Sequence, residues 1–204
     1  MSLAKFKKIK KKLKKKEFKS LIDIIKQENN DSILANLSEK NISKFINQVI
    51  ASRELSLFIV KKYDIIGYAV IAKKPHFLIK NFESLKFKFF FDLIINFKYF
   101  TLFNIFLAKI NIDNIFLTKN NKILISKSYN LNLLAIRKDY QSKGIGKKFL
   151  NYILTTIKKK DAHAITCETN NLRSNQFYNK KLNFKNIGIR LRLFKIMKIM
   201  IKKF

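Results

Sequence analysis

The 204-residue sequence contains one cysteine, one proline, four glycines and no tryptophan. Cys167 has no second cysteine to pair with, which excludes an intrachain disulfide and any multi-cysteine zinc site and favours a reducing cytosol. The two histidines, His76 and His163, lie far apart in the sequence and form no two-histidine metal spacing. We therefore expect a cytoplasmic protein that binds no metal ion.

Acidic residues are scarce as well: 13 Asp and Glu stand against 44 Lys and Arg, which gives a formal net charge of +31. A charge of this size attracts RNA and anionic membrane surfaces. Only five of the basic residues are arginines, however, and arginine is the side chain suited to bidentate phosphate recognition. Nucleic acid is therefore not the expected partner. Two explanations of the positive charge remain: binding to an anionic membrane surface, and compositional drift in an A/T-rich coding sequence.

Long uncharged apolar runs are absent, although hydrophobic residues make up 48% of the chain and aromatic residues 13%. The most apolar segment, 76–117, is interrupted by lysines and by Asp92, so no stretch reaches the length that a bilayer requires. We expect a helical hydrophobic insertion there, which covers the core or lies on a membrane surface. The remaining chain divides into a lysine-rich, partly helical arm over 1–20, without a signal-peptide pattern, and a single domain over 21–204.

Regular apolar patterns are present in the rest of the chain. Helical spacing predicts two amphipathic helices near the N-terminus, and β-branched and aromatic runs predict an antiparallel hairpin. Further on, a buried strand, an amphipathic helix and a second buried strand predict a parallel pair with a right-handed crossover. The expected ranges are 56–60 and 65–71 for the hairpin, 122–126, 131–136 and 164–169 for strands, 149–157 and 172–182 for helices, and 187–201 for closing strands. These elements predict an α+β fold.

A turn that joins the first buried strand to the following helix has the sequence Gln-Ser-Lys-Gly-Ile-Gly, residues 141–146. Free amides at a helix N-terminus carry partial positive charge, and glycines let a pyrophosphate approach the backbone closely. The turn is not a Walker loop, because Gly-Lys-Ser/Thr is missing. It is not a dinucleotide fingerprint either, because Phe149 stands where that motif requires its third glycine. We expect it to bind an anion.

At these residues the sequence resembles the GCN5-related N-acetyltransferase (GNAT) superfamily. Motif A of that family is a strand followed by Arg/Gln-x-x-Gly-x-Gly/Ala, which residues 133–146 match. A second match resembles the family's pattern of Asn, small residue, aromatic-Tyr and Gly-Phe, and consists of Asn171, Ser174, Phe177, Tyr178 and Phe184. The resemblance covers about 130–188. It departs from the family at Asn183, where glycine is usual, and by one extra residue between Tyr178 and Phe184.

The resemblance implies a GNAT-like, mostly antiparallel sheet whose central parallel strands splay at the site of acetyl-coenzyme A (acetyl-CoA). Tyr178 would protonate the departing thiolate, and Asn171 would contact the cofactor. The other implied cofactor contacts are strand backbone groups at Leu134, Ala135 and Ile136 for pantetheine, and Gln141, Ser142, Lys143, Gly144, Ile145, Gly146 and Lys147 for the pyrophosphate. We add Glu168 as the candidate base, because it lies near the end of the second parallel strand.

The expected activity is direct transfer of the acetyl group to a primary amine on a small molecule. The insertion at 76–117 resembles, more weakly, one in bacterial relatives associated with surface-glycan synthesis, which suggests a nucleotide- or lipid-linked amino sugar as acceptor. A peptide or protein amine is the second choice. The competing hypothesis is a basic RNA- or membrane-binding protein without catalysis. For the acetyltransferase, the expected location is the cytoplasm, with peripheral attachment to the inner face of the membrane.

Overall fold

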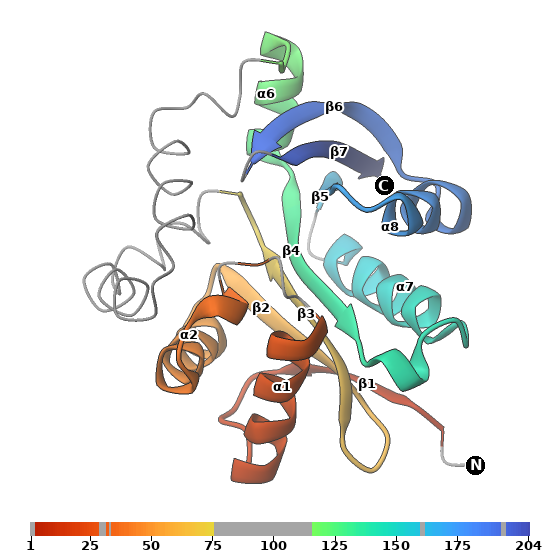
Figure 1. The fold of residues 1–204 in the computed structure, drawn as a ribbon. Helices are drawn as coiled ribbons and strands as arrows, with labels where there is room; N and C mark the ends of the chain where they lie inside the picture. Colours follow the sequence, from red (N-terminus) through yellow and green to blue (C-terminus); the bar gives the residue numbers. More distant parts are fainter. Residues whose placement is uncertain (1–2, 29–31, 33, 76–115, 160–161, 193–194) are drawn as a thin grey trace.

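The computed structural model of the chain describes residues 3–28, 32, 34–75, 116–159, 162–192 and 195–204. Nearly all of the insertion expected at 76–117 lies outside these residues. The described chain forms a seven-stranded sheet in the order β1-β2-β3-β4-β5-β7-β6 (Figure 1). Its strands are β1 Lys5–Ile9, β2 Leu55–Lys61, β3 Ile65–Ala72, β4 Tyr129–Ile136, β5 Ala164–Thr169, β6 Lys185–Arg192 and β7 Lys195–Lys203.

Neighbouring strands of this sheet run antiparallel except for β4 and β5, which are parallel. The crossover between those two strands contains α7 (Ile145–Lys158). The predicted α+β fold, a mostly antiparallel mixed sheet with a central parallel pair and flanking helices, is therefore confirmed. The hairpin of β2 and β3 is confirmed too, since Phe58 lies opposite Ala69 in antiparallel register.

Helices cover both faces of the sheet. Figure 1 shows α1 (Lys15–Glu28) and α2 (Glu39–Ala51) on one side, here called the front face, and α7 with α8 (Leu172–Gln176) on the other, the back face. Each long helix buries one apolar stripe, as its sequence period predicts. In α7 the buried stripe is the predicted one: Phe149, Leu150, Ile153, Leu154 and Ile157.

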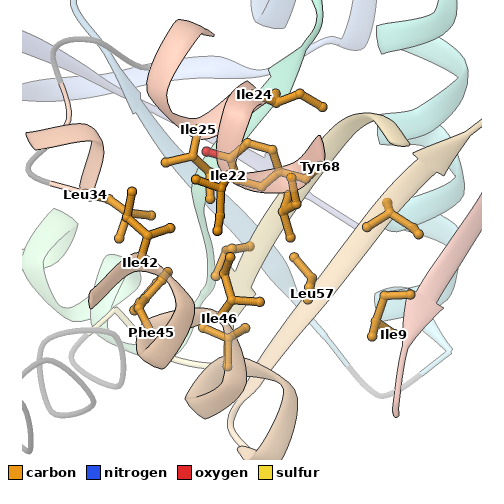
Figure 2. Packing of buried hydrophobic residues seen from close by; sticks show 14 of the residues in the cluster. Ile9, Ile22, Ile24, Ile25, Leu34, Ile42, Phe45, Ile46, Leu57 and Tyr68 are labelled. Carbon is orange, nitrogen blue, oxygen red and sulfur yellow. The ribbon is translucent and has the colours of Figure 1, made fainter. Parts of the chain in front are cut away.

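The front core is built around a buried tyrosine of β3. Figure 2 shows the ring of Tyr68 beneath α1, among Ile22, Ile24 and Ile25, and Tyr68 is 1% exposed. The back core packs α7 onto β2, β3 and the parallel strands. Because each face carries its own core, the sheet is a buried middle layer, and a ligand can reach its centre only where strands separate.

The segment 122–126 was expected to be a strand and is instead part of helix α6 (Lys119–Lys127). Thr118 caps this helix, since its hydroxyl oxygen accepts a hydrogen bond from the Asn121 amide. Leu117 and Ile125 bury against Ile199 of β7. A short apolar run fits either a strand or one helical face, and here the cap and the packing select the helix.

The structure of residues 1–20 also differs from the predicted arm. Residues 5–9 form strand β1 at the edge of the sheet, paired with β2, and residues 15–20 belong to α1. Phe6 and Ile9 are three positions apart, which places them on opposite faces of a strand. Phe6 accordingly stacks on Phe149 of the back core at 5.7 Å between ring centroids, while Ile9 enters the front core. The prediction of a separate tail is therefore wrong, because apolar residues of this segment pack in both cores.

We expect Phe6→Ala to lower the free energy of unfolding by about 2 kcal/mol, because a partly buried ring leaves the back core. The exposed neighbour Lys7 is the matched control, and Lys7→Ala should change stability by no more than about 0.5 kcal/mol. Urea unfolding followed by circular dichroism measures both values. Equal, small effects would indicate a solvated arm.

Candidate active site

The parallel strands β4 and β5 pair over a short distance and then separate. Their register runs from Tyr129 opposite Ile165 to Leu131 opposite Cys167. Beyond Leu131, β4 continues to Ile136 with β3 on one side and no strand partner on the β5 side among the described residues. Backbone N–H and C=O groups on that edge can pair with an extended ligand. The predicted splay is present.

A β-bulge lies at the point of separation. Leu131 is opposite Ile71 and Leu133 is opposite Val70, so Asn132 is an extra residue in β4. A bulge bends its strand and increases the local twist. The bend therefore starts at the residue where the pairing with β5 stops.

The turn after β4 begins with a short 3-10 helix, Lys138–Tyr140, and reaches α7 through two left-handed residues. Ser142 has φ 59° and Gly144 has φ 74°. The first helical hydrogen bond of α7 is donated by the Lys148 amide to the Gly144 carbonyl at 3.2 Å. The amides of residues 145–147 make no hydrogen bond with the described part of the chain. They form a donor cluster with partial positive charge.

The two glycines of the turn serve different needs. Gly144 adopts a left-handed conformation that an L side chain rarely takes, although a Cβ there would meet nothing within 4 Å. At Gly146 a Cβ would lie 3.6 Å from the ring of Phe177, an ordinary contact. Packing alone does not require glycine at 146. The absence of a side chain at both positions leaves the donor amides open to a ligand.

The side chain of Gln141 holds the turn together. Its Nε2 donates to the Ile136 carbonyl at 2.7 Å and to the Glu28 carboxylate at 3.0 Å. The other carboxylate oxygen of Glu28 accepts from the Lys138 amide at 2.8 Å. Glu28 is the last residue of α1, so this front-face helix is tied to the turn. No local pattern marked Glu28, which contacts residues more than a hundred positions away.

Asn171 follows β5 and caps α8. Its Oδ1 accepts from the amides of Arg173 at 2.8 Å and Ser174 at 3.3 Å, so the predicted cap is confirmed. Its Nδ2 group makes no hydrogen bond with a described residue, which leaves that group available to a ligand.

Tyr178 lies in the back core at 7% exposure, between Phe177 and Phe184. Its hydroxyl has no hydrogen-bond partner among the described residues. Burial, with a smaller effect from Cys167, raises the pKa of Tyr178 well above its ordinary value. The hydroxyl therefore keeps its proton at neutral pH, which a general acid must do.

A π-helical turn accommodates the extra residue between Tyr178 and Phe184. The helix changes from α8 to a π-helix at Phe177–Lys181, which takes up one additional residue per turn. Asn183 then has φ 57°, the predicted left-handed stop. Tyr178 and Phe184 remain in ring contact at 5.5 Å between centroids, so the insertion does not displace either from the core.

Glu168 is the first residue of β5 beyond its last pair with β4. Its neighbour Cys167 points into the back core, so the Glu168 side chain faces the front. There the Arg190 guanidinium of β6 donates to its carboxylate, and both side chains are nearly buried. Glu168 and Tyr178 thus lie on opposite faces of the sheet beside the splay.

Residues 117–184 match the sequence model of the Acetyltransferase (GNAT) family. This range spans β4, the turn, α7, β5 and the helix with Tyr178, which is the site described above. The part of the chain that holds the site is thus similar to the GNAT family. The match supports acetyl transfer as the activity.

Solved GNAT structures have the same fold over nearly the whole chain. Polyamine N-acetyltransferase of Drosophila melanogaster has a TM-score of 0.63 at 8% identity, covering 98% of this chain and 100% of its own. The Escherichia coli ribosomal-protein-S18-alanine N-acetyltransferase has a TM-score of 0.56 at 12% identity, with coverages of 98% and 94%. A NatC complex bound to a Gag peptide and CoA has a TM-score of 0.54 at 14% identity, with coverages of 98% and 98%. No curated protein sequence matches the chain.

Among the described residues, no three His, Cys, Asp or Glu side chains gather where they could hold a metal ion. Within the same residues, no helix has the length and apolar character needed to cross a bilayer.

We expect Glu28→Ala to lower the free energy of unfolding by about 1–2 kcal/mol, because two hydrogen bonds from the turn lose their acceptor. Asp23→Ala, an exposed carboxylate on the same helix, is the matched control and should have little effect. Hydrogen exchange of the amides at 138–142 should also accelerate in Glu28→Ala alone. The same exchange rates in both variants would mean that Glu28 does not hold the turn.

Proposed function

We propose that this protein transfers the acetyl group of acetyl-CoA to a primary amine. The observation that carries the proposal is the splay of β4 and β5, whose open strand edge leads directly to the donor amides of the turn. An extended pantetheine chain fits a free strand edge, and a pyrophosphate fits a helix N-terminus with left-handed Gly144 before it. Acetyl-CoA use is typical of the GNAT family.

The proposed cofactor contacts divide by chemistry. Backbone groups of Leu134, Ala135 and Ile136 would pair with pantetheine on the open edge of β4. The amides of residues 142–147, with the exposed Lys143 and Lys147 nearby, would bind the pyrophosphate. The Asn171 Nδ2 group would donate to the ligand from the β5 side. Gln141 would contribute by shaping the turn, since its amide already binds Ile136 and Glu28.

The acid and base would act at the splay. The acetyl thioester supplies the acyl group, and the attacking amine forms the new C–N bond as the C–S bond breaks. Tyr178 would donate its hydroxyl proton to the departing sulfur, and its raised pKa keeps that proton available. Glu168 would accept the proton released by the amine, with Arg190 fixing the carboxylate in place. The proton then returns to the Tyr178 oxygen through solvent.

For the acceptor we propose an amino sugar with a nucleotide or lipid carrier, and a peptide or protein amine as second choice. The net charge of +31 supports an acceptor with anionic groups. The second partner that we propose is an anionic membrane surface, from a cytoplasmic location. Helix α6 and the segment just before it support this partner, because Ile123 in the helix and Phe116 ahead of it are 46% and 59% exposed, near Lys119 and Lys122.

We expect acetyl-CoA to raise the melting temperature of the wild-type protein, because it binds only the native state. In Gly144→Val the dissociation constant should rise at least tenfold, since a side chain stands against the donor amides. The left-handed backbone should cost the variant about 1–2 kcal/mol of stability without unfolding it. Differential scanning fluorimetry and calorimetric titration measure both effects. No response of the wild type to acetyl-CoA would contradict the proposed function.

We expect Tyr178→Phe to reduce kcat by about 10²–10⁴-fold while acetyl-CoA affinity stays the same, because only the proton donor is lost. The raised pKa keeps Tyr178 protonated as pH rises, so wild-type kcat should not decline through this group below about pH 10. Tyr63→Phe, at an 86% exposed tyrosine, is the control. Release of free CoA with an amine acceptor gives the rates. Full activity of Tyr178→Phe would mean that the tyrosine is only a core aromatic.

A further inference from the structure

A hydrogen bond joins the two segments that leave the splayed strands. Arg173 Nη2 in α8 donates to Ser142 Oγ in the turn at 2.8 Å. Ser142 follows β4, whereas Arg173 follows β5. The bond therefore spans the chain segments on either side of the proposed cofactor site, and none of the cofactor contacts implied by the family resemblance includes Arg173.

The packing of α8 places Arg173 beside the donor amides independently of that bond. Phe177 lies four residues after Arg173, and its amide donates to the Arg173 carbonyl, so both side chains lie on one helical face. The Phe177 ring is the nearest group to the Cβ position of Gly146, at 3.6 Å. This face of α8 consequently lies against the N-terminus of α7, where the amides of residues 145–147 are unpaired.

The charge of Arg173 is not neutralised by the described part of the chain. Arg137 forms an ion pair with Asp139 at 3.3 Å, and Arg190 forms one with Glu168, but no described carboxylate pairs with Arg173. The remaining guanidinium N–H groups of this exposed side chain have no partner there either. A guanidinium with free donors binds phosphate oxygens in a bidentate manner, more strongly than it binds a serine hydroxyl.

We propose that Arg173 is a phosphate-binding residue of the site and that its guanidinium moves from Ser142 Oγ to a phosphate of coenzyme A. The inference rests on the proposed function, because it assigns a further contact to the same cofactor. The phosphate belongs either to the pyrophosphate or to the 3′-phosphate of the ribose. Both present the same oxygen chemistry to Arg173.

Calorimetric titration of CoA into the wild type, Arg173→Ala and Arg173→Lys tests the assignment. Arg173→Ala should bind CoA about tenfold more weakly, and Arg173→Lys should recover part of the loss, because charge returns without the bidentate geometry. The exposed Arg53, on the α2–β2 connection, provides a control with the same change of charge. Arg53→Ala should keep wild-type affinity within about twofold. The loss in Arg173→Ala should also shrink at high salt.

Titration of 3′-dephospho-CoA identifies the phosphate. A tenfold difference between wild type and Arg173→Ala that persists with this ligand assigns Arg173 to the pyrophosphate, and a difference that disappears assigns it to the 3′-phosphate. Equal CoA affinities of folded Arg173→Ala and Arg53→Ala would overturn the inference. Arg173→Gln serves if the alanine variant does not fold. A wild type that binds no CoA would instead contradict the proposed function itself.

Discussion

The early end of the pairing between β4 and β5 is the constraint on which the site depends. Had β5 followed β4 to Ile136, backbone hydrogen bonds would have filled the edge that a pantetheine chain needs. The bulge at Asn132 bends β4 away, while β3 keeps the other edge satisfied through Ile136. β5 continues with β7 as its partner as far as Thr169. The opening therefore occurs inside a sheet whose other strands remain paired.

The opening also connects the two layers of helices. Glu28 ends a front-face helix and accepts hydrogen bonds from the turn, while Arg173 reaches the same turn from a back-face helix. In the turn, the large apolar side chains that pack against a core are Tyr140 and Ile145, and both are only partly buried against the back core. Its conformation consequently depends on polar contacts from both faces.

Sequence patterns predicted the elements whose signals are local. The stripe of α7, the hairpin, the cap at Asn171 and the left-handed Asn183 follow from neighbouring residues, and all are present. β1 and α6 were mispredicted because short apolar runs fit more than one period, and packing decides between them. Glu28 and Arg173 were missed because each acts on residues distant in sequence. The roles of the site residues in binding and catalysis stay predictions.

The placement of Tyr178 and Glu168 constrains how two substrates could meet. Tyr178 packs in the back core together with Cys167 of β5, whereas the next residue, Glu168, faces the front, because alternate residues of a strand point to opposite faces. A sulfur beside Tyr178 would leave the thioester carbon between the strands, exposed to the front. An amine would then attack from the front, where the Glu168–Arg190 pair lies. The same sheet that separates the two cores would thus separate the proton donor from the proton acceptor.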